Sequence, residues 1–222
     1  HESSEHSILP WIHFSYVFSP PSYVFYYIKL DIINIMKKII LASKSPRRKE
    51  LLEKCNLPFV CEPADIDESL NQNLSLQEAI KELSYRKANA ILANHPDCIV
   101  IGSDTIVTLN GKVLGKPANE KIAFEMLKSL QGNTHQVITG ICILSKNRNF
   151  QDVVTSNVTF DSMSDEEILA YIQTGECLDK AGSYGIQGYG GRYITHIDGD
   201  YYAIMGLPLH IVYEELKHIG LY

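Results

Sequence analysis

Short apolar runs alternate with segments of helical periodicity after residue 36. The runs Lys38–Ala42 and Cys98–Leu109 predict buried strands, and Phe59–Cys61 predicts a shorter one. Further strands are expected at Lys112–Leu114, Val137–Leu144, Val153–Phe160, Arg192–Ile197 and Tyr201–Met205. Helices are expected from Ser45 to Cys55, from Ser75 to Asn94, from Asn119 to Gln131, from Ser164 to Thr174 and over Leu209–His218. The alternation predicts a single α/β domain with a mixed central sheet and flanking helices.

Cap and turn residues support several of these boundaries. Ser45 followed by Pro46 is typical of an N-cap and a first helical position. The segments Ser75–Glu78 and Ser164–Glu167 have the residues of a capping box. The pair Asn110 and Gly111 predicts a two-residue hairpin turn between neighbouring strands.

Residues 1–35 differ from the rest of the chain. Their apolar stretch, from Tyr16 to Ile35, is interrupted by two prolines and carries Lys29 and Asp31, so it makes a poor membrane span. It lacks the basic start and small-residue cleavage site of a signal peptide. Met36 leads directly into the first strand, as at a bacterial start. We therefore expect residues 1–35 to be an extraneous or disordered extension and 36–222 to be the working domain.

The composition excludes a disordered chain and argues against some classes of binding partner. Hydrophobic residues make up 45% of the chain and charged residues 21%. The formal net charge of −6 disfavours broad docking on nucleic acid or anionic membrane, although a local basic pocket remains compatible with it. Five scattered cysteines without a C-x-x-C pair predict reduced thiols and a cytoplasmic protein.

The first candidate site is the basic segment Ser43–Lys49, which joins a strand to a helix N-terminus. Unpaired N–H groups and the helix dipole favour an anion there, and arginine forks suit phosphate oxygens. A solvated first turn is the plainer alternative. However, basic residues oppose the dipole at that end, which favours a bound anion.

A second candidate is Asp104, which lies within an apolar strand. A buried carboxylate costs several kcal/mol unless it is paired or binds metal, so a functional role is favoured over a solvent-facing one. The acids Asp65, Asp67 and Glu68 follow the second strand and, taken alone, fit a solvated loop.

Two glycine-containing segments are less specific. Gly115-Lys116-Pro117 lacks the spacing of a P-loop. The segment 179–191 lacks the flanking strand, helix and acid of a dinucleotide-binding fingerprint. Its glycines would allow the backbone to approach a ligand closely, and the Gln187 amide could read a base edge.

Six segments occur in a distinctive order between Met36 and Tyr222. They are Leu41-Ala42-Ser43-x-Ser45-Pro46-Arg47-Arg48-x-Glu50-Leu51-Leu52, Gly102-x-Asp104-Thr105, Gly115-Lys116-Pro117, His135-x-Val137-x-Thr139, Asp179-Lys180-Ala181-Gly182-x-Tyr184-Gly185-Ile186-Gln187-Gly188 and Gly206-Leu207-Pro208. In this order they resemble the Maf (septum-formation inhibitor) family of nucleoside triphosphate pyrophosphatases. Residues 1–35 match no part of it.

The resemblance implies a fold and a reaction. The fold would have two lobes around a nucleotide cleft, similar to inosine triphosphate pyrophosphatases. The reaction would convert dTTP or UTP, including modified pyrimidine nucleotides, to the monophosphate and pyrophosphate, limiting misincorporation. It would use Mg²⁺ or Mn²⁺, since carboxylates are the available ligands and no Cys/His cluster exists. A homodimer and a link to division arrest are left open.

The resemblance also implies residue roles. Asp104 matches the proton acceptor, and Arg47, Thr105 and Gln187 match the positions that set substrate choice in the dTTP/UTP branch. The positions that resemble phosphate contacts are Ser43, Ser45, Arg48, Lys87, Lys116 and Lys180, while Asp67 and Asp104 resemble metal contacts.

Three questions stay open at this stage. Asp104 could take the proton of the attacking water or hold the metal that acidifies it. A 7-methyl-GTP pyrophosphatase of the same family is an alternative, although that branch differs at the substrate-choice positions. A non-catalytic, nucleotide-binding division regulator would need the basic pocket but not Asp104.

Overall fold

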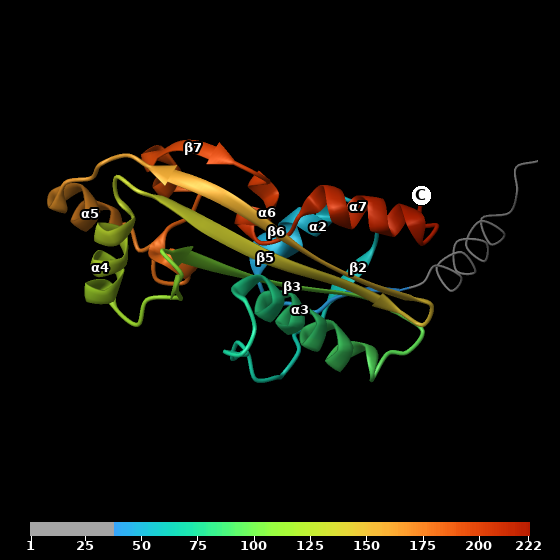
Figure 1. Cartoon of the computed structure of the whole chain (residues 1–222). Helices are drawn as coiled ribbons and strands as arrows, with labels where there is room; N and C mark the ends of the chain where they lie inside the picture. The colour runs from blue at the N-terminus through green and yellow to red at the C-terminus, as the bar shows by residue number, and fades with distance from the viewer. Residues whose placement is uncertain (1–37) are drawn as a thin grey trace, which may run out of the picture. The chain divides into compact units, whose positions relative to one another are not determined.

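The computed structural model describes residues 38–222 (Figure 1). The expectation for residues 1–35 lies outside the described residues. The strands are β1 Ile39–Leu41, β2 Phe59–Cys61, β3 Ile99–Leu109, β4 Lys112–Leu114, β5 Thr134–Ser145, β6 Arg148–Phe160 and β7 Ile194–Asp198. The α-helices are α2 Pro46–Glu53, α3 Leu76–Leu92, α4 Glu120–Leu130, α5 Asp165–Ile172, α6 Tyr201–Met205 and α7 Leu209–His218. Two 3₁₀ turns, η1 Ala181–Ser183 and η2 Tyr189–Tyr193, complete the elements.

The strands form a seven-stranded mixed sheet, as the sequence predicts. Its order is β2-β1-β3-β5-β6-β7, with β4 paired to β3. β1 runs parallel to both β2 and β3, whereas β3, β5, β6 and β7 are antiparallel neighbours. β5 and β6 form a long hairpin that extends along the whole sheet (Figure 1).

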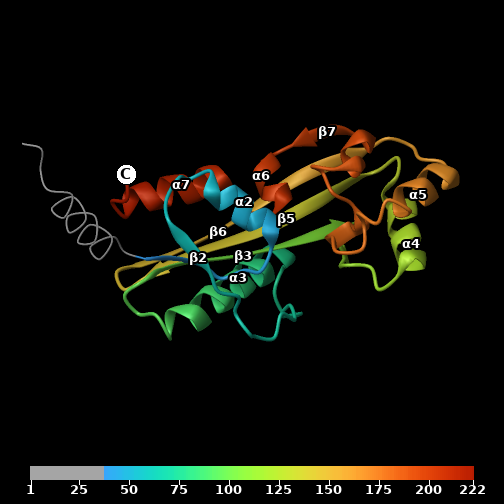
Figure 2. The same ribbon diagram turned by 180° about the vertical axis from the view of Figure 1, so that it is seen from behind.

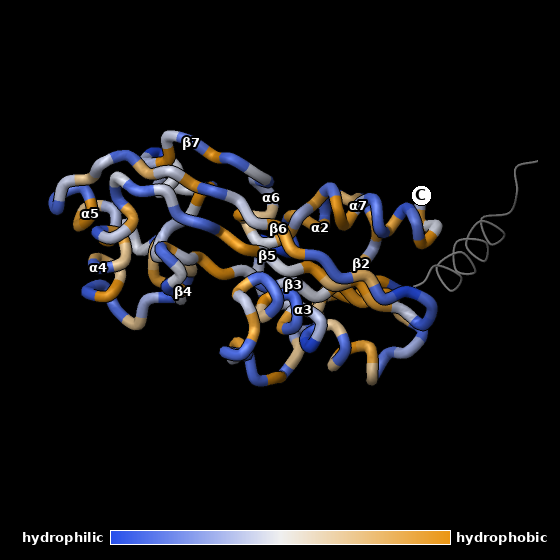
Figure 3. The backbone as a smooth tube through the Cα atoms, in the orientation of Figure 1, coloured by the Kyte–Doolittle hydropathy of each residue, from blue (hydrophilic) through white to orange (hydrophobic). Residues whose placement is uncertain are grey.

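Helices cover both faces of the sheet. α2 and α7 lie on one face and α3 on the other in both views (Figures 1 and 2). Successive residues of β3 point to opposite faces, so Ile101 packs with Leu51 and Leu216, while Val100 packs with Ala88. The central strands are accordingly hydrophobic along most of their length (Figure 3).

A second group of core residues lies at the other end of the sheet. It contains Leu127 of α4, Tyr171 of α5 and Phe160 of β6, all buried. Figure 1 shows α4 and α5 at this end, away from α2, α3 and α7. The two groups correspond to the two lobes that the resemblance implies.

Two expectations about the C-terminal third need correction. Tyr201–Met205 is the helix α6 and not a strand, and β7 begins two residues after the expected Arg192 because η2 precedes it. Aromatic and apolar residues favour strands locally. Asp200 nevertheless caps α6, since its Oδ1 accepts the N–H groups of Tyr202 at 2.7 Å and Ala203 at 3.2 Å.

Among residues 38–222, no helix has the length and apolar character required to span a membrane.

Candidate active site

A pocket of about 630 Å³ lies where β3 has no neighbouring strand on one edge. Along that edge, β1 pairs with Ile99–Ile101 and β4 pairs with Val107–Leu109. Within the described chain, the edge between these two pairings is covered by no strand. Asp104 and Thr105 lie in this interval and line the pocket. The gap between β1 and β4 therefore exposes polar side chains in the middle of an otherwise buried strand.

Two cations meet at one oxygen of Asp104. Oδ1 lies 3.1 Å from Nη2 of Arg48 and 3.3 Å from Nζ of Lys87. Arg48 comes from α2 and Lys87 from α3, so the cations approach from opposite faces of the sheet. The Lys87 side chain is only 6% exposed and that of Asp104 19%. This pairing offsets the cost of placing a carboxylate in the strand.

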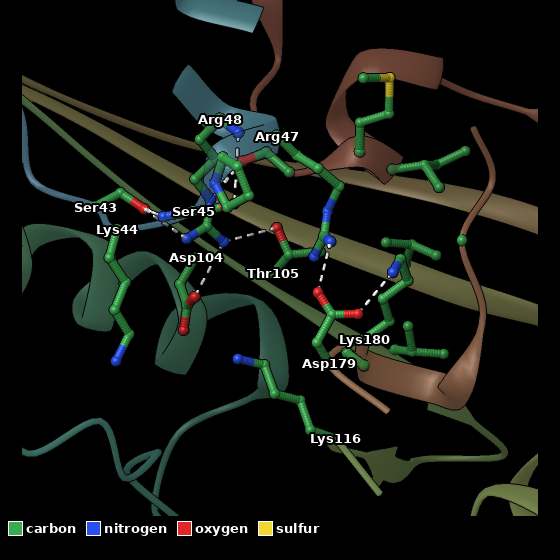
Figure 4. A pocket seen from close by; sticks show the side chains of 18 of the residues that line it. Ser43, Lys44, Ser45, Arg47, Arg48, Asp104, Thr105, Lys116, Asp179 and Lys180 are labelled. Carbon is green, nitrogen blue, oxygen red and sulfur yellow. Dashed lines mark hydrogen bonds and ion pairs between the residues drawn. The ribbon is translucent and has the colours of Figure 1, made fainter. Parts of the chain in front are cut away.

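The guanidinium of Arg48 is fixed by further contacts (Figure 4). Its Nε donates to the carbonyl oxygen of Gly206 at 2.9 Å, and its Nη1 and Nη2 donate to Ser43 Oγ and Thr105 Oγ1, both at 3.4 Å. Ser45 caps α2, with its Oγ accepting the N–H of Arg48 at 3.4 Å. The first turn of α2 thus presents an oriented arginine fork to the pocket.

The acids after β2, Asp65, Asp67 and Glu68, are exposed on a loop. The carboxylate of Asp67 accepts the N–H and hydroxyl of Ser69 at 2.9 and 2.7 Å, and these hydrogen bonds lower the pKa of Asp67. Asp67 does not line the pocket, whereas Glu68 does, and its Oε1 lies 2.9 Å from Lys87 Nζ. Glu68 is therefore the acid that the structure brings near Asp104.

Further cationic side chains surround the pocket. Lys44, Lys116, Lys180 and Arg47 all line it, and Figure 4 shows Lys116 pointing into it. Asp179 accepts from Lys180 Nζ at 2.6 Å and from Arg47 Nη1 at 3.4 Å. Lys44 and Lys116 have no ion-pair partner within residues 38–222. They are available to an anionic ligand.

The remaining lining is apolar or amide-bearing. Gln187 is exposed to the pocket on the loop that precedes η2. Thr105 lies deeper, with its Oγ1 2.9 Å from Thr139 Oγ1. The apolar lining residues include Val107, Val137, Tyr184, Ile186, Ile204 and Met205. A pocket that combines several cations with an apolar wall suits a polyphosphate attached to a planar ring.

The residues present fit a divalent cation that arrives with phosphate. Within the described part of the chain, no group of three or more His, Cys, Asp or Glu side chains could hold a metal ion. The carboxylates of Asp104 and Glu68 both line the pocket. Mg²⁺ is commonly bound by one or two carboxylates, with substrate phosphates and water completing its coordination. This donor set is compatible with such an ion.

The pocket gathers every site residue expected from the sequence except Asp67. Sequence reasoning missed Glu68, Glu176 and Asp179 as lining residues. Glu68 adjoins the expected acid, and Asp179 begins the glycine-containing segment. Glu176 follows Gly175 at a helix end and offered no signal of its own.

Solved structures with partial similarity to this chain include the Staphylococcus aureus Ham1 protein and a nucleoside-triphosphatase / dITP/XTP pyrophosphatase from Mycobacterium abscessus. The first is 19% identical, with a TM-score of 0.43 over 71% of this chain and 80% of that one. The second is 11% identical, with a TM-score of 0.38 over 57% and 75%.

Sequence relatives are much closer. A protein of Bacillus cereus (strain ATCC 10987 / NRS 248) named dTTP/UTP pyrophosphatase is 47% identical over 186 residues, which cover 84% of this chain and 92% of the relative. A Bacillus mycoides protein of the same name is 47% identical over 182 residues, covering 82% and 95%. The family model described as Maf-like protein matches residues 38–219. The chain therefore belongs to the Maf-like protein family.

Proposed function

We propose that this protein is a nucleoside triphosphate pyrophosphatase that hydrolyses dTTP and UTP to the monophosphate and pyrophosphate. The observation that carries the proposal is the carboxylate of Asp104, held by Arg48 and Lys87 at the centre of a cationic pocket. Two Bacillus relatives with this activity in their names support it. The proposed setting is the cytoplasm, which agrees with five free cysteines.

The triphosphate would bind along the cationic part of the pocket. Arg48 offers an oriented guanidinium, and Lys44 and Lys116 offer ammonium groups without a partner in the described chain. Each charge-assisted contact to a phosphate oxygen is stronger than a neutral hydrogen bond. The base would then lie against the apolar wall, near Gln187.

In the reaction, a water attacks the α-phosphorus and the bond to the β-phosphate oxygen breaks. Oδ1 of Asp104 accepts a hydrogen bond from Arg48 and forms an ion pair with Lys87, which leaves Oδ2 to take the proton of the water. Lys116 and Arg48 would stabilise the charge on the phosphate oxygens and on the departing pyrophosphate. A divalent cation such as Mg²⁺ or Mn²⁺, held by Glu68 and the phosphates, would supply further positive charge and polarise the attacking water.

Base choice would depend on Gln187, with Arg47 and Thr105 beside the nucleotide. Uracil and thymine present the same O2, N3–H and O4 edge, whereas cytosine exchanges a donor and an acceptor. An amide offers both a donor group and an acceptor, so an oriented Gln187 can pair with the uracil and thymine edge. A polar site of this kind rejects a mismatched base because its own groups are left unpaired.

Pyrophosphate release from a panel of nucleotides tests the proposal. With Mg²⁺ or Mn²⁺ present, dTTP and UTP should be hydrolysed comparably, and CTP, ATP and GTP much more slowly. A preference for 7-methyl-GTP would instead indicate the alternative activity, that of a 7-methyl-GTP pyrophosphatase. Nucleotide binding without turnover would indicate a nucleotide-binding regulator.

A further inference from the structure

The loop that carries Gln187 is fastened to two side chains of a neighbouring helix end. We call residues 185–190, which include the first two residues of η2, the Gln187 loop. Glu176, just after α5, accepts the N–H of Tyr189 on Oε2 at 2.8 Å and that of Gly190 on Oε1 at 3.2 Å. Tyr171, within α5, accepts the N–H of Gly185 on its hydroxyl oxygen at 3.1 Å. Both ends of the loop are therefore anchored by side chains.

The two anchors are joined to each other. The hydroxyl of Tyr171 donates to Oε1 of Glu176 at 2.8 Å, and the Tyr171 side chain is fully buried. Because the hydroxyl donates its proton to Glu176, the hydroxyl oxygen is oriented to accept the backbone N–H of Gly185. The carboxylate and the phenol thus act as one polar unit between the loop and α5.

The glycines of the loop make this unit fit. A Cβ at Gly188 would overlap the carboxylate of Glu176, and one at Gly190 would lie 2.8 Å from the Tyr171 hydroxyl oxygen. The sequence suggested that these glycines admit a ligand closely. In the structure, they admit the side chains of Glu176 and Tyr171.

The occupied carboxylate argues against a direct role for Glu176 at the phosphates. Its two oxygens already accept three hydrogen bonds, from Tyr171, Tyr189 and Gly190. Burial raises the pKa of Glu176, but these hydrogen bonds outweigh it and keep the pKa below the ordinary value. Glu176 therefore remains an ionised acceptor at neutral pH, directed at the loop.

We infer that Glu176, together with Tyr171, is a positioning residue that fixes the Gln187 loop and thereby sets the discrimination between nucleotide bases. The inference rests on the proposed function only for the identity of the substrates. A loop with three glycines in six residues loses much conformational freedom when it is ordered. Because the loop is already anchored in the free protein, less of this entropic cost has to be met when the nucleotide binds.

The variants Glu176→Gln and Tyr171→Phe test the inference. Each carboxylate oxygen accepts a backbone N–H, so the glutamine amide must place its NH₂ against one of these donors in either orientation. The phenylalanine keeps the ring and removes only the hydroxyl. Glu125→Gln, on an exposed position of α4, and Tyr213→Phe, on α7, are the matched controls.

Amide hydrogen exchange in the free protein provides a readout that needs no substrate. Glu176→Gln should speed exchange at Tyr189 and Gly190, and Tyr171→Phe at Gly185, by about tenfold or more, with the central strands unchanged. The control variants should leave all three amides as they are. Unchanged exchange in both test variants would overturn the inference.

Steady-state kinetics tests the consequence for base choice. Glu176→Gln should raise KM for UTP and dTTP about tenfold, keep kcat within about threefold, and lower the UTP-to-CTP ratio of kcat/KM about tenfold. Gln187→Ala should lower the same ratio. An equal fall in kcat for every nucleotide, or an unchanged ratio, would contradict the assigned role. If the wild-type protein hydrolyses neither dTTP nor UTP, the proposed function fails, while the exchange measurement still decides whether Glu176 positions the loop.

Discussion

At the scale of single residues, the environment of Asp104 follows from its place on β3. Its side chain points to the face covered by α3, where Lys87 reaches it, and the open strand edge lets Arg48 reach it from α2. A carboxylate in a fully paired strand interior could not be approached from both faces. The gap between β1 and β4 thus allows Arg48 and Lys87 to pair with Asp104 and to offset the cost of placing its charge in the strand.

The charge of Asp104 should be essential for turnover. Asp104→Asn keeps the size of the side chain but removes the basic oxygen, so kcat should fall by about 10²-fold or more. Nucleotide should still bind, as judged by equilibrium titration, because the cations remain. Asp97→Asn, on an exposed position beyond α3, is the control and should leave kcat unchanged. Near-normal turnover in Asp104→Asn would remove Asp104 from the chemistry.

Lys116 should contribute to every nucleotide alike. Lys116→Ala removes an ammonium group that points into the pocket. We expect kcat/KM for dTTP, UTP and CTP to fall by a factor that corresponds to a loss of about 2–3 kcal/mol in transition-state stabilisation. Lys112→Ala changes an exposed lysine of β4 outside the pocket and serves as the control. A loss confined to one base would place Lys116 at the base instead.

Among the residues that line the pocket, the sequence singled out those that conflict with their local surroundings. A charged residue in an apolar strand, and basic residues at a helix N-terminus, both violate local preferences and therefore marked the site. Glu68 and Glu176 lie in polar segments, where an acidic residue conflicts with no local preference. Their roles depend on Lys87 and on the Gln187 loop, which only the tertiary structure brings to them.

At the scale of elements, the position of α3 is set by two glycines on the sheet. Gly102 of β3 and Gly140 of β5 both face α3, and a Cβ at Gly140 would lie 2.5 Å from the carbonyl oxygen of Ile80. Without side chains at these positions the helix lies directly on the strands. This close packing brings Lys87, one turn beyond Ser84, to Asp104.

Gly140→Ala should therefore move α3 and weaken both stability and activity. We expect a loss of about 1–3 kcal/mol in the free energy of unfolding, from overpacking against backbone. The kcat/KM should fall as well, because Lys87 is displaced from Asp104. Urea unfolding checks the first expectation and UTP hydrolysis the second. Gly115→Ala, where a Cβ meets nothing within 4 Å, should leave stability unchanged.

Most elements could be predicted from the sequence because the hydrophobic periodicity, the helix-cap residues and the turn residues indicated the same boundaries. The helix α6 could not, because its five residues are aromatic or apolar and too short to show a helical period. Its stability comes from the Asp200 cap and from tertiary contact, where the hydroxyl of Thr139 donates to the Ala203 carbonyl at 2.7 Å. Such contacts between distant residues leave no local pattern.

At the scale of the whole molecule, a buried histidine ties stability to pH. His135 of β5 is 1% exposed, and its Nε2 lies 2.8 Å from the hydroxyl of Tyr184. Its Nδ1 is buried without a hydrogen-bond partner within the described residues. Burial lowers the pKa of His135 to about 4, from an ordinary value of 6.5. The native state therefore holds this imidazole neutral in the core of the α4–α5 lobe.

The sign of the pH dependence follows from linkage. Between these two pKa values the unfolded chain binds a proton at His135 that the native state does not, so acidification favours unfolding. The stabilisation is complete above 6.5 and is lost as the pH falls towards 4. Between about pH 7 and about pH 5 the free energy of unfolding should fall by about 2 kcal/mol from this group. Glu176 and Asp179, whose pKa values are lowered, lose their contribution only below 4.5 and 3.8.

Urea unfolding at the two pH values isolates the effect. His135→Phe removes the titrating group, and although it also removes the partner of Tyr184, its free energy of unfolding should change little between about pH 7 and about pH 5. His196→Gln, at an exposed position of β7, should keep the wild-type difference. The difference between the two pH values is the decisive quantity, because any general destabilisation by the larger ring cancels in it. If His135→Phe retained the wild-type pH dependence, another group would have to bind the proton on unfolding, and His135 would not be the neutral buried base that its surroundings indicate.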